Sequence, residues 1–263
     1  MRFKSALLCA LLFFATSAAE AADVLLKPFV LASKGAGKIA EKAAQVKSAL
    51  TGSGYTVVGE YAPYPGADIV IVTSDELKKN AAASEFGGYG AVQRIAITEA
   101  GPDVQVSYTN PVYMANVYRM KDDLGNVAAS LAAALGRIEE FGSAHGMTAK
   151  QARKYHYMLG MEYFDEPSVL AEYGSHDEAV QAVDAKLANN KNGVARVYRV
   201  DIPGSSLFGV SMKGSGAGKF MDERFIMNEI DFPDLSMMGK NSFMNIMDTP
   251  EAIRLALQKT VAK

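Results

Sequence analysis

The sequence VQRIAITEAGPDVQVSYT, residues 92–109, carries a pattern from which the fold class of this chain follows. The apolar Ile95 and Ile97 alternate with smaller or more polar residues such as Arg94. This period is typical of a strand in a sheet with one face in water. The Gly-Pro-Asp sequence at 101–103 predicts a hairpin turn. Residues 92–109 are therefore expected to form two antiparallel strands.

Strand and helix patterns continue along the rest of the chain. The other strand-like runs are Val24–Ala32, Tyr55–Tyr61, Asp68–Thr73, Val194–Ile202, Leu207–Met212 and Phe225–Ile230. Helix patterns cover 37–51 and 126–139, and Thr249 begins a further helix with proline at its first position. Thr148 and Ser175 each precede Gln or Glu by three residues, as in a capping box. Because hairpins and crossovers are mixed, we predict an α+β fold of two lobes, with largely antiparallel sheets and helices packed on one face.

The helix expected over 126–139 has one apolar stripe. Val127, Leu131, Leu135 and Ile138 recur at helical spacing and fall on one side of the helix. The pattern predicts a continuous helix that packs through this side.

The first 21 residues have the order of a cleavable secretory signal. Arg2 and Lys4 precede the apolar run Ala6–Ala15, and small residues follow up to Ala21. The apolar run is too short for a membrane anchor, since spanning takes about 20 residues. We therefore expect cleavage after Ala21 and a mature protein that lies in a bacterial periplasm or is secreted.

The composition of the mature chain excludes several kinds of site. The one cysteine, Cys9, lies in the signal, so no disulfide, thiolate nucleophile or cysteine-ligated metal is expected. Of 27 basic and 29 acidic residues, 25 and 28 remain after signal removal, which gives a net charge of −3. Nucleic acid is not an expected partner, because its binding needs concentrated positive charge. No second apolar run approaches spanning length, so we expect no membrane span after cleavage.

The mature chain is expected to divide at a joint over residues 140–168. This segment is rich in turn residues and ends in Asp165-Glu166-Pro167. We place the first lobe at 22–143 and the second at 144–263. Each lobe offers a strand, a helix and a strand pair, so the second could be a degenerate repeat of the first.

Three segments of the first lobe form a recognisable set. A helix ends in the first segment, Leu50-Thr51-Gly52-Ser53-Gly54-Tyr55-Thr56-Val57. The hairpin Val104–Thr109 continues into Asn110-Pro111-Val112-Tyr113-Met114, and the helix Val127–Leu135 closes the unit. In these segments residues 24–136 resemble the DUF302 family, bacterial domains of unknown function. The resemblance implies a compact α+β fold for this lobe and supplies no catalytic residue. The second half of the chain resembles no family.

Methionine is the most unusual component, with twelve residues beyond Met1. Thioethers bind Cu(I) well, and a thiol-free chain offers Met and His as its soft ligands. His156, Met158 and Met161 could form a copper site if the helix loosens near Gly160. On a regular helix His156 and Met158 would point apart. The alternative is that the methionines fill irregular gaps in the core.

Tyrosines are dense at the end of the first lobe and in the joint. Tyrosine combines an apolar ring with a polar tip, which suits a cleft or a partner surface. Tyr108, Tyr113, Tyr155 and Tyr157 are candidates for the lining of a ligand cleft between the lobes. The alternative is an interface of the two lobes lined by tyrosines. A Gly-rich segment around Tyr89, residues 86–90, has no assigned place in the family pattern.

The sequence contains no catalytic motif. His145, His156 and His176 are isolated and lack zinc-ligand spacing, and no Gly-x-Ser-x-Gly elbow occurs. The leading hypothesis is an exported, non-enzymatic binding or interaction protein, with a small molecule or a protein as partner. One alternative is a periplasmic copper-handling protein with Met and His ligands. The other is an enzyme whose acids and bases come together only in the fold. A pocket with two carboxylates of strongly shifted pKa, or with a His–carboxylate pair, would indicate it.

Overall fold

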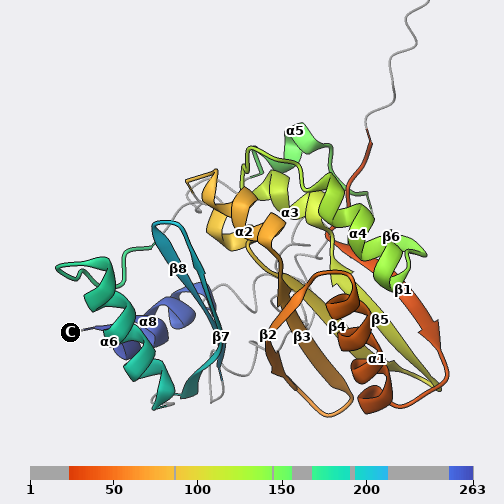
Figure 1. Ribbon diagram of the computed structural model, residues 1–263, viewed down its shortest axis with the longest axis horizontal. Helices are drawn as coiled ribbons and strands as arrows, with labels where there is room; N and C mark the ends of the chain where they lie inside the picture. The colour runs from red at the N-terminus through yellow and green to blue at the C-terminus, as the bar shows by residue number, and fades with distance from the viewer. Residues whose placement is uncertain are drawn as a thin grey trace, which may run out of the picture.

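A computed structural model describes residues 24–85, 87–143, 145–155, 168–189, 193–212 and 249–262 of the chain (Figure 1). The strands in these ranges form a six-stranded antiparallel sheet and a two-stranded hairpin, and helices pack on both. This arrangement confirms the α+β fold with largely antiparallel sheets. None of the helices described has both the length and the hydropathy that a membrane crossing requires.

The large sheet has the strand order β2-β3-β4-β5-β1-β6, and every neighbouring pair is antiparallel. Its strands are β1 (Phe29–Gly35), β2 (Thr56–Tyr61), β3 (Ala67–Thr73), β4 (Gln93–Ala100), β5 (Asp103–Thr109) and β6 (Glu139–Phe141). Residues 92–109 supply β4 and β5, as predicted, and these strands lie in the middle of the sheet. Gly101 turns between them with a φ of 67°, a backbone angle that favours glycine. The strand predicted at Phe225–Ile230 lies outside the described residues.

Two helices, α1 (Ile39–Gly52) and α4 (Gly125–Leu135), cover one face of the large sheet (Figure 1). Ile95 of β4, Leu50 of α1 and Leu131 of α4 are fully buried in the apolar cluster beneath them. Burying one such side chain stabilises the fold by about 1.5–3 kcal/mol. This face therefore forms the main core.

The opposite face is covered in part by the hairpin of β7 (Val194–Ile202) and β8 (Ser205–Met212). Val200 of β7 lies in one apolar cluster with Ile71 of β3 and Ala96 of β4. Ala96 is only 5% exposed. The prediction that this face of β4 is in water is therefore wrong at Ala96, because the hairpin packs over it.

A second helical layer lies on the far side of the hairpin. Helices α6 (His176–Ala188) and α8 (Thr249–Val261) pack there (Figure 1). Leu187 of α6 and Val194 of β7 are buried between these helices and the hairpin. The described residues thus form four layers, in the order helices, large sheet, hairpin, helices.

The remaining described elements are short. They are α2 (Asp75–Ala82), η1 (Gly87–Gly90), α3 (Pro111–Val117) and α5 (Ala149–Ala152). α5 packs on α3, and Met147 forms an isolated bridge with Leu26 ahead of β1. These contacts join residues 145–155 to the part of the chain that forms the large sheet. We therefore name the described residues of 24–155 the first unit and those of 168–262 the second unit.

The helix predicted over 126–139 is shorter in the structure. α4 ends at Leu135, and Gly136 follows with a φ of 97° and a ψ of 171°. Ile138 is 60% exposed, and Glu139–Phe141 form β6, which pairs with β1. The prediction was wrong at this end because the apolar period continues past the glycine at which the backbone leaves the helix.

Helices begin at both predicted capping boxes, but the two boxes differ in their hydrogen bonds. At the start of α5, Thr148 Oγ1 accepts from the Gln151 backbone N–H at 3.2 Å, and Gln151 Oε1 accepts from the Thr148 N–H at 2.8 Å. This confirms the capping box. At α6, Ser175 Oγ accepts from the Glu178 N–H at 3.1 Å, but the Glu178 carboxylate accepts from Gly174. In this second motif the glutamate side chain therefore bonds to the residue before the N-cap, Gly174, and not to the N-cap Ser175 itself.

Asp68 at the start of β3 makes stability dependent on pH. Burial raises the pKa of Asp68, and the neighbouring Glu60 carboxylate raises it further. The folded protein therefore keeps this proton to a higher pH than the unfolded chain, and stability falls as the pH rises from about 4 through the raised pKa. Asp68→Asn removes the charge. We expect a higher thermal midpoint than wild type at about pH 7 and no gain below about pH 4, measured by circular dichroism.

Asp75 provides a control of opposite sign. Lys78 Nζ lies 2.8 Å from Asp75 Oδ1 and holds the pKa of this exposed carboxyl below its usual range. Asp75→Asn is therefore expected to lower the midpoint slightly at neutral pH. A midpoint for Asp68→Asn at or below that of wild type at neutral pH would contradict the reasoning for Asp68.

Candidate functional site

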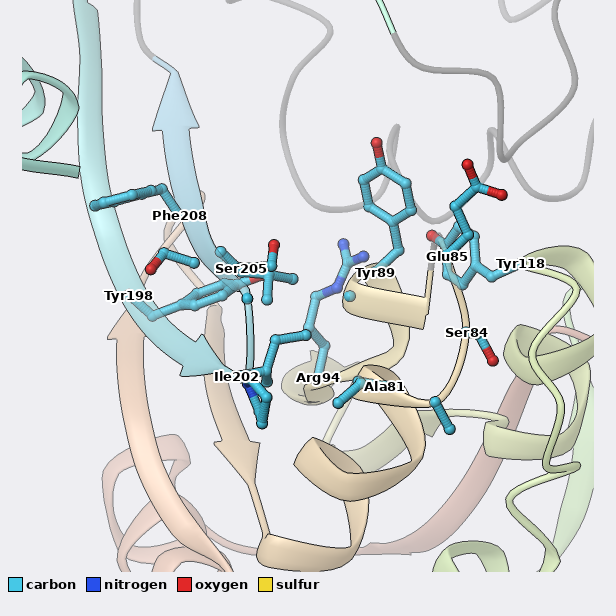
Figure 2. Close-up of a pocket in the computed structure, with 17 residues that line it drawn as sticks. Ala81, Ser84, Glu85, Tyr89, Arg94, Tyr118, Tyr198, Ile202, Ser205 and Phe208 are labelled. Atoms are coloured by element: carbon cyan, nitrogen blue, oxygen red, sulfur yellow. The ribbon is translucent and has the colours of Figure 1, made fainter. Parts of the chain in front are cut away.

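A cleft of about 690 Å³ opens between the two units (Figure 2). One wall consists of the C-terminal end of α2 and of η1, and the other is the tip of the β7–β8 hairpin. Arg94 of β4 and Tyr118, which follows α3, complete the lining. Ligand pockets occur preferentially at such junctions and enclose roughly 300–1,000 Å³. This cleft is therefore the candidate functional site.

Tyr89 lies in the first wall, where glycine permits close packing of η1 on α2. A Cβ at Gly87 would collide with the carbonyl oxygen of Ala81, so only glycine allows this approach. Tyr89 itself is 47% exposed, and its ring centroid lies 5.3 Å from that of Tyr118, with an angle of 34° between the rings. The Gly-rich segment without a place in the family pattern thus supplies one ring, Tyr89, of an aromatic pair that lines the cleft.

Tyr198 lies in the opposite wall. The register of β7 against β8 shifts between Arg196 and Tyr198, and this bulge turns Tyr198 toward the large sheet. Tyr198 is paired with Gly209 on β8, and a Cβ at Gly209 would collide with the tyrosine ring. The absence of a side chain at Gly209 therefore leaves the space that this ring occupies.

Arg94 supplies positive charge to the cleft. It stands on β4 between Gln93 and Ile95, and because Ile95 points into the helical core, strand alternation sends Arg94 to the hairpin side. Figure 2 shows the Arg94 side chain directed into the cleft, toward Tyr89. The residue is partly buried, which strengthens its electrostatic interactions relative to those in bulk water.

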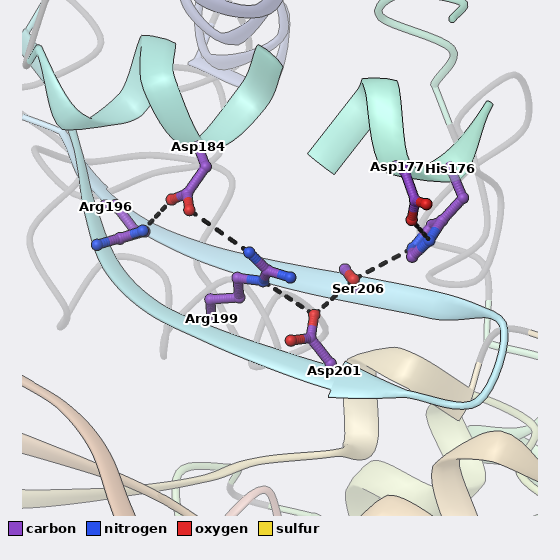
Figure 3. A network of polar contacts seen from close by, with 7 residues as sticks. All are labelled: His176, Asp177, Asp184, Arg196, Arg199, Asp201 and Ser206. Carbon is purple, nitrogen blue, oxygen red and sulfur yellow. Dashed lines mark hydrogen bonds and ion pairs between the residues drawn. The ribbon is translucent and has the colours of Figure 1, made fainter. Parts of the chain in front are cut away.

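A polar network attaches the hairpin to α6 (Figure 3). Asp184 of α6 pairs with Arg196 and Arg199 of β7. Arg199 Nε donates to Asp201 Oδ1 at 2.9 Å. The hydrogen bonds from Arg199 and then from Ser206 lower the pKa of Asp201. Because the hairpin tip forms one wall of the cleft, this network helps to position that wall.

Ser206 contacts His176 at the end of this network, and the geometry opposes a catalytic role. The Ser206 hydroxyl lies 3.2 Å from His176 Nε2 and 2.6 Å from Asp201 Oδ1. An ionised carboxylate can only accept, so Ser206 donates its proton to Asp201 and accepts from His176. Asp177 Oδ1 lies 3.7 Å from His176 Nδ1, beyond hydrogen-bond distance. A general base must instead accept the proton of the nucleophile.

The tyrosines predicted to line a ligand cleft lie away from this one, as far as the structure describes them. Tyr108 and Tyr113 are 1% and 0% exposed, in two different apolar clusters. Burial raises the pKa of Tyr108 to about 12. Tyr155 is half-buried against the cluster of Tyr113, and Tyr157 lies outside the described residues. Buried rings offer no surface to a ligand, so Tyr108 and Tyr113 stabilise the core.

The predicted copper ligands His156, Met158 and Met161 lie outside the described residues, so that site stays a prediction. Within the described ranges, no three His, Cys, Asp or Glu side chains are close enough to hold a metal ion. His176 is 53% exposed in the first turn of α6, as expected of a surface residue.

Comparisons with known proteins do not identify what the cleft binds. The resemblance of residues 24–136 to the DUF302 family stays a prediction from the sequence, and the function has to be inferred from the residues of the cleft. No protein-family model matches the chain, and no curated protein matches its sequence.

Proposed function

We propose that the protein is exported to the periplasm or secreted and acts there as a non-enzymatic binding protein. Its ligand is a small molecule that occupies the cleft between η1 and the hairpin tip. The observation that carries this proposal is the cleft itself, about 690 Å³ in volume and placed at the junction of the two units. Aromatic, hydroxyl and guanidinium groups line it, a mixture that can bind an apolar body and orient a polar group.

Two observations favour binding over catalysis. The sequence lacks a motif with nucleophile and base at a productive spacing. The Ser–His contact described above directs the serine proton to Asp201 rather than to His176. Export is supported by the charged, apolar and small-residue order of the first 21 residues.

Native mass spectrometry of the protein extracted from the periplasm of an expressing bacterium tests the proposal. We expect a chain that begins at Ala22 and carries an organic molecule that is lost on denaturation. A copper ion in place of the organic molecule would favour the Met and His site instead. Turnover of the bound molecule by the purified protein would overturn the non-enzymatic assignment.

A matched pair of variants locates the bound molecule. Ala82 is exposed in the cleft wall, and Ala82→Trp is expected to displace the molecule by filling the cleft with an indole ring. Ala133 is exposed on α4 and does not line the cleft, so Ala133→Trp is expected to retain the molecule. Retention in both variants would place the ligand elsewhere.

A further inference from the structure

Residues from both faces of β8 line the cleft. Leu207 packs toward the large sheet, whereas Phe208 packs toward α6 and α8. Both line the cleft, together with Ser205 and Ser206. Successive side chains of a strand point to opposite faces of the sheet, so a cleft that is lined from both faces runs along the edge of the strand. The cleft therefore follows the edge of β8 at residues 205–208.

β7 borders the same cleft through one face only. Tyr198 and Ile202 of β7 line it, and both belong to the apolar cluster that faces the large sheet. Arg199, which pairs with Asp184 of α6 on the other face, does not line it. The edge that the cleft follows is thus the one that β8 turns away from β7 (Figure 2).

The backbone of this edge offers hydrogen-bonding groups to a ligand. In an antiparallel pair, every second residue of a strand directs its N–H and C=O away from the partner strand. Within the described ranges the hairpin sheet has two strands, and β7 is the one element whose backbone pairs with residues 205–208. A strand edge of this kind is a template for another extended chain.

We infer that the ligand of the cleft is a short peptide in extended conformation, which pairs with the edge of β8 as a third strand of the hairpin sheet. This inference rests on the proposed function and names its ligand class. Strand residues rise about 3.3 Å each, so a peptide of about five residues spans the lined edge. Main-chain hydrogen bonds give such an added strand its affinity, and contacts of alternate side chains give it specificity.

The first unit supplies the contacts for these alternate side chains. Tyr89 of η1 lies across the cleft from the edge of β8, and its side chain is 47% exposed (Figure 2). Gly88 beside it would bring a Cβ to within 3.4 Å of Leu207, so η1 and β8 approach each other closely at one end of the cleft. Every second side chain of the peptide faces this wall, where an aromatic or β-branched residue finds the Tyr89 ring.

Titration calorimetry with the uncharged peptide acetyl-Thr-Tyr-Thr-Tyr-Thr-amide tests the inference on the mature protein. Its β-branched and aromatic residues favour a strand. Two N-methylated forms are matched probes, one methylated at the second and fourth residues and one at the third and fifth. Because alternate N–H groups of an added strand bond to its neighbour, we expect one form to bind about 30-fold more weakly, the size of two lost hydrogen bonds, and the other to stay within about threefold of the parent peptide.

Amide hydrogen exchange, followed by NMR with and without the parent peptide, locates the pairing. We expect alternate amides of residues 205–208 to exchange quickly in the free protein and about tenfold or more slowly at saturation with peptide. The amides of β2 are the control, because β2 is an edge strand of the large sheet that does not line the cleft. Ala82→Trp is expected to abolish both effects and Ala133→Trp to retain them.

Other outcomes overturn the inference and leave the proposed function to its own test. Equal affinities of the two methylated forms would indicate binding through side chains without strand pairing. Protection of all amides of residues 205–208 in the free protein would show that the chain itself covers this edge. No binding of the parent peptide up to about 1 mM would overturn the ligand class. The proposed function fails only if native mass spectrometry finds no molecule displaced by Ala82→Trp.

Discussion

Leu131→Ala is expected to lower the free energy of unfolding by about 3 kcal/mol, whereas Ile138→Ala should change it by less than about 0.5 kcal/mol. The two residues belong to one apolar stripe in the sequence. Leu131 is fully buried in the cluster between α4 and the large sheet, and its truncation leaves a cavity. Ile138 lies beyond the end of α4 with 60% of its surface exposed, so truncation removes little packing. Urea unfolding followed by circular dichroism measures both values.

The comparison between the two variants is the decisive part of this experiment. A cost for Ile138→Ala close to that of Leu131→Ala would show that the helix continues to residue 138 and buries the whole stripe. The denaturant dependence should stay the same in both variants, because neither changes the surface exposed on unfolding by much. A changed slope in Leu131→Ala would indicate a loss of cooperative unfolding rather than a simple cavity.

Local patterns predicted β1 to β5 of the large sheet, because each is an alternating or continuous apolar run that turn residues or helix patterns bound. Ile95 and Ile97 of β4 point into the core beneath α1 and α4, and the turn at Gly101 needs the positive φ that glycine adopts readily. β7 was predicted at its observed bounds, Val194–Ile202. The bounds of a strand with one apolar face and a turn residue at its end can therefore be predicted largely from its own residues.

Pairing over long distances in the chain was not predictable in the same way. β6 consists of Glu139–Phe141, and its pairing with β1 joins residues about a hundred positions apart. The three residues carry no alternation long enough to recognise. The hairpin covers Ala96 on a face expected to be in water. The sequence did not show this, because a small residue such as alanine occurs on both exposed and buried faces.

The candidate site shows the same limit. The sequence predicts Tyr108 and Tyr113 as cleft residues because tyrosine combines an apolar ring with a polar tip. The same property lets both rings fill the core, where the Tyr108 hydroxyl bonds to a backbone carbonyl. Arg94 was visible only as a polar residue in an alternating strand. Tyr89 was visible only as the aromatic residue of a Gly-rich segment. The cleft that both residues line exists only where the hairpin of the second unit packs against the first, and no local pattern contains that packing.

Gly136→Ala is expected to lower the free energy of unfolding by about 3 kcal/mol, although it adds a single methyl group. Gly136 ends α4 with a φ of 97° and a ψ of 171°, a region that is essentially restricted to glycine. A Cβ at this position would lie 2.7 Å from the backbone oxygen of Ala32 in β1. The Gly136 carbonyl also accepts the Tyr108 hydroxyl at 3.4 Å, so a shift of this segment disturbs the core. Thermal and urea unfolding measure the loss.

Gly35→Ala is the matched control for this substitution. Gly35 ends β1 in the same sheet, its φ is not positive, and no atom lies within 4 Å of the position of an added Cβ. Alanine there reduces the freedom of the unfolded chain, so we expect stability to be unchanged or raised by up to about 1 kcal/mol. If Gly136→Ala proved as mild as Gly35→Ala, the backbone at 136 would not have the conformation that ends α4. The helix would then extend toward Ile138, and the pairing of β6 with β1 would be lost.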